Sequence, residues 1–276
     1  REAMACQFEV LLNAKQYPLG AEAAVAALDR IDELEAQLTV YRDLSEVQHI
    51  NKTAAERPVP VETGLFQLLV RACELYTATN GAFDITSGPL TKIWGFYRRQ
   101  GNMPSAAEID QALQCVDCRQ LELNPAAEEV RFLKPGMELN LGAIGKGYAL
   151  DRAADVLLTQ GIDDFCFHGG MSSVLARGQR RRSGQQGWQV ALRHPLRPDA
   201  RLATFCLENQ ALGTSGSGTQ FFHHRGKRYG HILDPRSGWP ADKVLSATVI
   251  APNAEQADAL STACYVLGID EAAAFL

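Results

Sequence analysis

A glycine-rich stretch, Glu138–Asp151 (ELNLGAIGKGYALD), constrains the fold of this 276-residue chain more than any other segment. An extended, apolar lead-in runs into three glycines, and a helical pattern follows from Tyr148 to about Gln160. Glycines let backbone N–H groups approach an anion closely, and the N-terminus of the following helix presents a partial positive charge in the same direction. Because Lys146 adds a full charge, the stretch predicts a loop that holds a phosphate or pyrophosphate.

This loop is not one of the common nucleotide-binding fingerprints. The phosphate loop of many NTPases needs Gly-Lys followed by Ser or Thr, whereas Gly147 follows Lys146 here. The spacing Gly142-x-x-Gly145-x-Gly147 is the reverse of the dinucleotide fingerprint. Taken alone, the loop is therefore compatible with a plain structural turn as well as with a ligand site.

The composition indicates a globular chain with a substantial core, as one large domain or two closely joined subdomains. Hydrophobic residues make up 46% and charged residues 21%, and the formal net charge of −5 gives no reason to expect a nucleic-acid partner. One basic cluster, Arg177 with Arg180, Arg181 and Arg182, lies among Gly, Gln and Ser and indicates a solvated loop between strands. No apolar run approaches the roughly 18 residues that a membrane-spanning helix needs.

Seven cysteines are an odd number, and most stand in apolar or helical contexts, so we expect buried or half-buried thiols and no disulfide framework. Cys115-x-x-Cys118 lacks a second pair or a nearby histidine, so it is a poor zinc signal.

Hydrophobic periodicity predicts an α+β fold with an antiparallel sheet rather than a doubly wound parallel one. An amphipathic helix is expected over 20–38, a loop over 42–60, a helix capped by Thr63 that runs to about Thr79, and an irregular segment over 81–101. Further predicted elements are helices at 105–114, 148–160 and 254–267, strands near 5–12, 119–123, 129–133, 137–141, 164–168, 172–177, 187–193, 202–208 and 245–251, and a hairpin near 221–231.

Near the C-terminal end, Asp258, Ser261 and Thr262 stand at i, i+3 and i+4 of a predicted helix and therefore share one face. One carboxylate with two hydroxyls offers hard oxygen ligands, which suit Mg²⁺ or Ca²⁺ rather than zinc. The alternative is an exposed acid in the first turn, stabilised by the helix dipole, with Thr262 bonded to its own backbone.

His231 is a second candidate, because it lies in the segment HILDP where a strand should meet a turn. A histidine there can take a proton from an incoming nucleophile at neutral pH, although an ordinary hydrogen-bonded histidine fits the pattern as well.

Several motifs in register resemble the ApbE family, the FAD:protein FMN transferases. They are GAFDITSGPLTKIWGF, LNLGAIGKGYALDRAADVL, the Gly-Gly at 169–170, ALGTSG, GHILDPRSGWP and TVIAPNAEQADALSTACYVLG, and together they cover roughly residues 4–268. The resemblance implies a single ApbE-like domain of mixed and antiparallel sheets flanked by helices. Its N-terminal part would span about 1–135 and its C-terminal part about 136–276, with the FAD and metal site between these subdomains.

The resemblance also implies a reaction. A Mg²⁺-dependent enzyme would bind FAD, esterify FMN to a Thr or Ser of a target flavoprotein and release AMP. Asp258 and Thr262 would ligate the metal through side-chain oxygens and Ala143 through its backbone carbonyl, while Ser261 stands where some relatives carry an acid. His231 matches the family histidine proposed as catalytic.

The same resemblance implies flavin contacts at eight positions. Asp84 would be a hydrogen-bond partner for the adenine or ribose, unless it only caps a turn, and Met4 and Tyr41 fit equally as packing residues. The full set is Met4, Tyr41, Ala82, Phe83, Asp84, Asn140, Lys146 and Leu233.

The chain departs from the family pattern at four places. Asn140 stands where many relatives have Asp, Met171 follows the Gly-Gly where an Asp is common, and Ser217–Gly218 replace the usual charged or aromatic residues. The sequence also stops at Leu276, where relatives continue for a further helix and strand. Two alternatives stay open. A pyrophosphatase that hydrolyses FAD to FMN and AMP would have the same metal site and His231, and Asn140 and Met171 give some support to a non-catalytic flavin-binding protein.

Compartment, oligomeric state and target flavoprotein do not follow from the sequence. The resemblance favours the cell envelope, whereas seven cysteines favour the cytoplasm slightly. No signal peptide is visible in the opening REAMACQFEV, and a removed export signal stays an open alternative.

Overall fold

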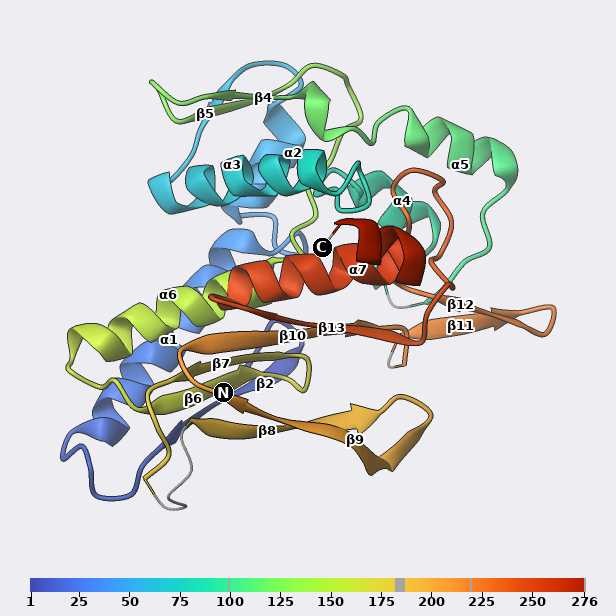
Figure 1. The fold of residues 1–276 in the computed structure, drawn as a ribbon. Helices are drawn as coiled ribbons and strands as arrows, with labels where there is room; N and C mark the ends of the chain where they lie inside the picture. Colours follow the sequence, from blue (N-terminus) through green and yellow to red (C-terminus); the bar gives the residue numbers. More distant parts are fainter. Residues whose placement is uncertain (99, 182–186, 219, 276) are drawn as a thin grey trace. The chain divides into compact units, whose positions relative to one another are not determined.

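The computed structural model of the chain describes residues 1–98, 100–181, 187–218 and 220–275 (Figure 1). These residues divide into two compact units, each assembled from three stretches of chain. The first unit consists of Arg1–Ala36, Ile144–Ser215 and Ser246–Ser261, and the second of Gln37–Ala143, Gly216–Leu245 and Thr262–Leu276.

A six-stranded sheet forms the centre of the first unit, with the strand order β1-β2-β6-β7-β10-β13. The neighbouring pairs from β1 to β10 are antiparallel. Strands β6 and β7 are buried on both faces, which explains their continuous apolar character. The strands span Glu2–Ala3 (β1), Cys6–Leu12 (β2), Phe165–Gly169 (β6), Ser173–Arg177 (β7), Gln210–Gly216 (β10) and Ser246–Ala251 (β13).

Two layers cover this sheet. The helices α1 (Gly20–Leu38) and α6 (Gly145–Thr159) lie on one face, together with the first turns of α7 (Ala254–Phe275), and the hairpin of β8 (Trp188–His194) and β9 (Arg197–Leu207) lies on the other (Figure 1). A buried apolar cluster joins the sheet to the hairpin, with Val174 and Leu212 on the sheet and Trp188 and Leu207 on the hairpin.

The second unit combines short helices with two small sheets. Its core surrounds Trp94, whose indole Nε1 donates to the carbonyl oxygen of Gly238 at 2.8 Å. The helices are α2 (Glu46–Thr53), α3 (Thr63–Ala78), α4 (Gly88–Ile93), η1 (Phe96–Arg98), α5 (Ala106–Leu113) and η2 (Cys118–Gln120). The strands are β3 (Val59–Pro60), β4 (Leu121–Asn124) and β5 (Glu129–Phe132) in the order β3-β5-β4, and the pair β11 (Phe221–His224) and β12 (Lys227–Gly230).

The predicted α+β class is confirmed, and the helix predicted over 20–38 has the predicted bounds. The loop predicted over 42–60 is wrong, because it contains α2 and β3. In α2 the buried Ser45 side chain caps the helix by accepting from the backbone N–H of Gln48 at 3.1 Å, and only Val47 and Ile50 are buried. Two apolar residues in eight are too weak a pattern to reveal a helix.

Three further predictions needed correction. Residues 137–141 form only an isolated bridge between Glu138 and Ser87 instead of a strand. The segment 81–101 contains α4 and η1 rather than irregular chain throughout, and the cap of α3 is Glu62 instead of Thr63. The helix expected to end near Leu267 does bend there, because Gly268 takes a φ of 78°.

The cysteine prediction is confirmed in its main point, since the described residues include all seven cysteines and contain no disulfide. Cys206 is exposed, whereas the other six are buried or half-buried. Within the basic cluster, Arg177 ends β7 and Arg182 lies outside the described residues. None of the helices in the described part of the chain is both long and apolar enough to cross a membrane.

Candidate functional site

Asp258 on α7 is the most heavily engaged of the predicted site residues in the first unit. The residue is 5% exposed. Oδ1 accepts a hydrogen bond from Ser173 Oγ at 2.5 Å, and Oδ2 accepts from the backbone N–H of Gly147 at 2.8 Å. The ammonium nitrogen of Lys146 lies 3.6 Å from Oδ2. Two predicted candidates, the glycine loop and the acid of the C-terminal helix, are therefore neighbours.

Glycine is required at two places where α7 packs closely. A Cβ on Gly147 would lie 2.1 Å from the carbonyl oxygen of Ala254, and a Cβ on Gly213 would lie 2.3 Å from that of Ala257. Both contacts are with backbone, which cannot move aside as a flexible side chain can. These two glycines thus allow α7 to approach α6 and β10, and this approach brings Asp258 to the glycine loop.

Asp151 fixes the N-terminus of α7. Its carboxylate accepts hydrogen bonds from the backbone N–H groups of Ala254 and Glu255, each at 2.9 Å, and is buried. These are two of the N–H groups that a helix leaves without an internal partner. Burial raises the pKa of Asp151 to about 6, although the two hydrogen bonds act in the opposite direction. A carboxylate on α6 therefore sets the position of α7.

Hydroxyl groups continue the polar surroundings of Asp258 along α7. Ser261 is buried, its Oγ donates to the carbonyl oxygen of Asp258 at 2.9 Å, and it lies 2.9 Å from Ser215 Oγ. Thr262 follows on the same helix and is half-buried. Ala143 directly precedes Ile144, the residue before α6.

The predicted metal ligands have the right chemistry for a hard cation. They are one carboxylate, two hydroxyls and one carbonyl, all of them oxygen donors. In the described part of the chain there is no group of three or more His, Cys, Asp or Glu side chains that could hold a metal. Mg²⁺ is commonly bound by one or two carboxylates together with substrate phosphates, so a donor set with a single acid fits a site that the substrate completes.

His231, in the second unit, lies directly after β12. Its backbone N–H donates to the carbonyl oxygen of Gln220 at 3.2 Å, and its Nδ1 lies 3.1 Å from the same oxygen. A carbonyl oxygen can only accept, so Nδ1 carries the proton and Nε2 carries the basic lone pair of the neutral ring. This tautomer is the one that a proton acceptor at Nε2 requires.

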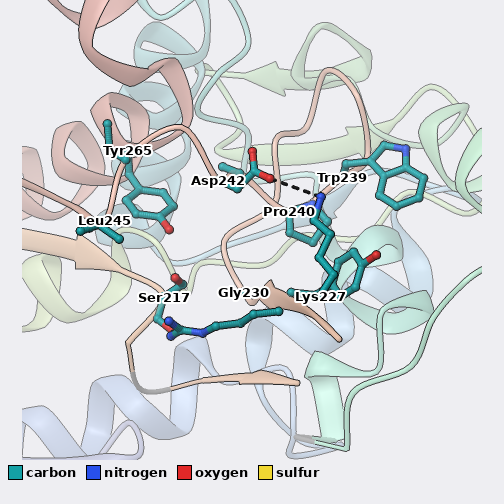
Figure 2. Close-up of a pocket in the computed structure, with 12 residues that line it drawn as sticks. Ser217, Lys227, Gly230, Trp239, Pro240, Asp242, Leu245 and Tyr265 are labelled. Atoms are coloured by element: carbon teal, nitrogen blue, oxygen red, sulfur yellow. Dashed lines mark hydrogen bonds and ion pairs between the residues drawn. The ribbon is translucent and has the colours of Figure 1, made fainter. Parts of the chain in front are cut away.

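The segment after His231 folds back on itself and borders a cavity of about 330 Å³. Asp234 N–H donates to Trp239 O at 2.8 Å, and Ala241 N–H donates to Ile232 O at 2.9 Å. Figure 2 shows the cavity, with Trp239 at one side and the ion pair of Lys227 and Asp242, 3.5 Å apart, beside it. Gly230, which also lines the cavity, directly precedes His231.

Asp84 is buried and holds its own turn. Oδ1 accepts from the backbone N–H and from the hydroxyl of Thr86, each at 2.7 Å, and Oδ2 accepts from the backbone N–H of Cys118 at 3.3 Å. Burial raises the pKa of Asp84, and these hydrogen bonds lower it. This is the turn-capping geometry that we gave as the alternative to a flavin contact. The neighbouring candidates Ala82 and Phe83, and Leu233 further along the chain, are buried.

Tyr41 is 64% exposed and faces Tyr97, with the ring centroids 4.9 Å apart. The Tyr97 hydroxyl donates to the carbonyl oxygen of Val40 at 2.6 Å, which holds the pair together. Met4, in the first unit, has a φ of 48°, and its N–H donates to Glu35 Oε1 at 2.6 Å. The exposed ring of Tyr41, supported by the half-buried Tyr97, offers a surface on which a planar ring can stack.

Asn140 organises the start of the glycine loop. Its backbone N–H donates to Ile85 O at 2.7 Å, its Oδ1 accepts from Gly142 N–H at 2.9 Å, and its Nδ2 lies 3.3 Å from Thr91 Oγ1. An aspartate could accept the same bond from Gly142 and a bond from the Thr91 hydroxyl, so the departure changes the charge more than the turn. Met171, the second departure, is 75% exposed.

The chain matches the ApbE family over residues 4–276. The chain belongs to the ApbE family. It is 34% identical over 248 residues to an FAD:protein FMN transferase of Klebsiella pneumoniae, an alignment that covers 89% of this chain and 76% of that protein.

Two solved structures have the same fold. The ApbE protein of Thermotoga maritima superimposes with a TM-score of 0.89 at 31% identity, covering 98% of this chain and 86% of that one. The apo form of the flavinyl transferase ApbE of Pseudomonas stutzeri gives 0.87 at 27% identity, covering 100% and 85%.

Three residues of this ApbE-family chain contribute to the site but were not predicted from the sequence. Ser173 and Asp151 take part in the arrangement of α7, and Tyr97 supports Tyr41. Asp151 carried a signal, because it ends the glycine motif and lies in the predicted helix four residues after Gly147, on the same helix face. Ser173 and Tyr97 carried none, because each contacts a residue far away in the sequence.

Proposed function

We propose that this chain transfers FMN from FAD to the hydroxyl of a Thr or Ser in a target flavoprotein and releases AMP. The observation that carries the proposal is the position of Asp258 beside Lys146 and the backbone N–H of Gly147 in the first turn of α6. Such a cluster suits a pyrophosphate and a cation together. The 34% sequence identity to a protein named FAD:protein FMN transferase supports the same reaction.

Phosphate binding is assigned to the glycine loop. Lys146, whose side chain is 25% exposed, supplies a positive charge, and the N-terminus of α6 supplies backbone N–H groups. Because Asp258 already neutralises part of the lysine charge, a cation is needed to balance the two phosphates. Asp258, Ser261, Thr262 and the carbonyl of Ala143 would hold Mg²⁺. When bound, Mg²⁺ would neutralise phosphate oxygens and stabilise the charge that develops on them.

His231 is assigned the proton transfer. Its Nε2 would take the proton of the acceptor hydroxyl as that oxygen bonds to the phosphorus of the FMN half. The bond between this phosphorus and the bridging oxygen breaks, and the electron pair leaves with AMP. The hydrogen bond between Nδ1 and Gln220 O holds the ring in the tautomer that this step requires.

Flavin binding is assigned to Met4, Tyr41, Asp84 with Ala82 and Phe83, Asn140 and Leu233. Tyr41 is the strongest of these on physical grounds, since it is exposed and already paired with a second ring. Asp84 would act through the turn that it holds, because both of its carboxylate oxygens accept hydrogen bonds from protein groups.

The test combines the purified chain with FAD, Mg²⁺ and a flavoprotein domain that carries an acceptor Thr, with the same domain carrying Val at that position as the control. Mass spectrometry should show an FMN-sized gain on the Thr domain only, AMP should be released, and EDTA should abolish both. Release of AMP without labelling of any acceptor would replace the proposal with FAD hydrolysis. Bound FAD without AMP release would replace it with flavin binding, and Asn140→Asp would then be the first reversion to make.

A further inference from the structure

Two cysteines of the second unit face each other. Cys73 on α3 and Cys118 in η2 have their Sγ atoms 2.8 Å apart, although they are separated by 45 residues of sequence. Cys118 is 3% exposed, whereas Cys73 is half-buried and therefore reachable from solvent. The side chains are already in contact, so joining them requires little backbone movement.

Two hydrogen bonds fix the surroundings of the thiols, one between α3 and the segment around η2 and one on Cys118 itself. The Tyr76 hydroxyl, one turn after Cys73, donates to Asp117 Oδ1 at 3.1 Å. The backbone N–H of Cys118 donates to Asp84 Oδ2 at 3.3 Å. The pair is therefore pre-organised by bonds on both sides, and the thiols are not needed to make the contact.

The same two segments line a cavity of about 580 Å³. Tyr76 and Thr77 contribute to its lining from α3, and Asp117 and Arg119, which flank Cys118, contribute from the segment around η2. A covalent bond between Cys73 and Cys118 would connect these two lining segments directly.

We propose that Cys73 and Cys118 form a disulfide when the protein meets an oxidising thiol–disulfide pool, and that this bond fastens α3 to η2. The oxidant is a small disulfide such as oxidised glutathione. The Cys73 thiolate attacks one sulfur of this disulfide, forming a mixed disulfide and releasing one glutathione thiolate. The Cys118 thiolate then attacks Cys73 Sγ and releases the second glutathione. The two cysteines lose two electrons and two protons, and these end on two glutathione thiols.

The exposures set the order of these steps. Cys73 can be reached by the small disulfide, whereas Cys118 is shielded. The hydrogen bond with Cys73 and burial both raise the pKa of Cys118, which makes it a poor first nucleophile. Once Cys73 carries glutathione, Cys118 lies next to the sulfur that it has to attack and acts as the resolving residue.

Peptide mapping of the whole protein tests the proposal. The reduced chain is equilibrated with oxidised glutathione, the remaining thiols are blocked under denaturing conditions, and the digest is analysed by mass spectrometry. We expect one cross-linked pair, Cys73 with Cys118, which dithiothreitol cleaves. The proposal would be overturned if Cys73 and Cys118 both carried the blocking reagent, which would mean that both stayed reduced. A disulfide of Cys115 with either residue would overturn it as well.

Single substitutions separate this pair from general thiol reactivity. Cys118→Ser should stop at the mixed disulfide on Cys73, Cys73→Ser should leave Cys118 reduced, and Cys115→Ser should cross-link like the unmodified protein. A disulfide that closes a loop of this length should raise the Tm of the oxidised protein by roughly 5–15 °C over the reduced one. Cys73→Ser should show the same Tm with and without reductant, and an equal reductant effect in both proteins would assign the stabilisation to another thiol.

Discussion

Asp151 gives the sharpest quantitative prediction, because one buried carboxylate both holds α7 and changes the response of stability to pH. Burial raises its pKa from 3.8 to about 6. The folded state therefore binds a proton more tightly than the unfolded state does. The resulting contribution to the free energy of unfolding is fully present below about pH 4 and is lost as the pH rises through about 6.

The size of this contribution follows from the two pKa values. At about 1.4 kcal/mol per tenfold change in proton affinity, the displacement from 3.8 to about 6 corresponds to roughly 3 kcal/mol in all. About half of this, roughly 1.4 kcal/mol, should be gained between about pH 7 and about pH 5. Asp151→Asn removes the titration, so the free energy of unfolding of the unmodified protein minus that of the variant should be larger at the lower pH by this amount.

Urea unfolding at several pH values between about 5 and 8 measures the difference. Asp155→Asn is the matched control, since Asp155 lies on the same helix and is 55% exposed. Its difference from the unmodified protein should stay nearly constant with pH. If the Asp151→Asn difference is equally constant, the carboxylate does not titrate in this range and the reasoning from burial fails.

The remaining predictions concern the candidate site. Gly213→Ala should cost about 1–3 kcal/mol of stability, because its Cβ would meet the Ala257 carbonyl, whereas Gly218→Ala has open space and should unfold like the parent. Lys146→Ala should weaken FAD binding in equilibrium titrations, and unchanged affinity would indicate that the glycine loop is a structural turn and no phosphate site. Asp258→Ala should abolish Mg²⁺-dependent activity, and full retained activity would remove it from the metal site. His231→Ala should slow turnover by about 100- to 10,000-fold while FAD binding stays intact, and an unchanged rate would exclude proton transfer.

Elements with a strong periodic pattern could be predicted from the sequence. The helix over 20–38 carries five apolar residues at helical spacing, and α5 has a complete capping box between Ser105 and Glu108. By contrast, α2 depends on a buried cap at Ser45 and on contacts with distant residues. The extended segment 137–141 resembles a strand locally but finds only one bridge, to Ser87. Whether α2 and the segment 137–141 form regular structure depends on which distant segments lie beside them. A local sequence pattern does not contain that information.

For the candidate site, the sequence predicted which residues share one helix but not which elements come into contact. The i, i+3, i+4 spacing placed Asp258, Ser261 and Thr262 on one helix, as the structure has them. The contact between Asp258 and Lys146 was not predictable from spacing, because it depends on Gly147 and Gly213 admitting α7. The individual roles of these residues in binding and catalysis stay predictions.

The pairing of β2 with β6 also affects how the protein is made. Leu12 lies opposite Phe165, so about 150 further residues must leave the ribosome before this pair of strands can form. At roughly 5–20 residues per second, translation leaves β2 without β6 for about 8–30 s, whereas a hairpin closes in about 1–10 μs. During this interval the segments of the second unit that precede β6 are already available to fold. Until β6 arrives, the edge of β2 that it will cover has no strand to pair with and is open to association with other chains, and the sheet of the first unit is completed only when β13 follows.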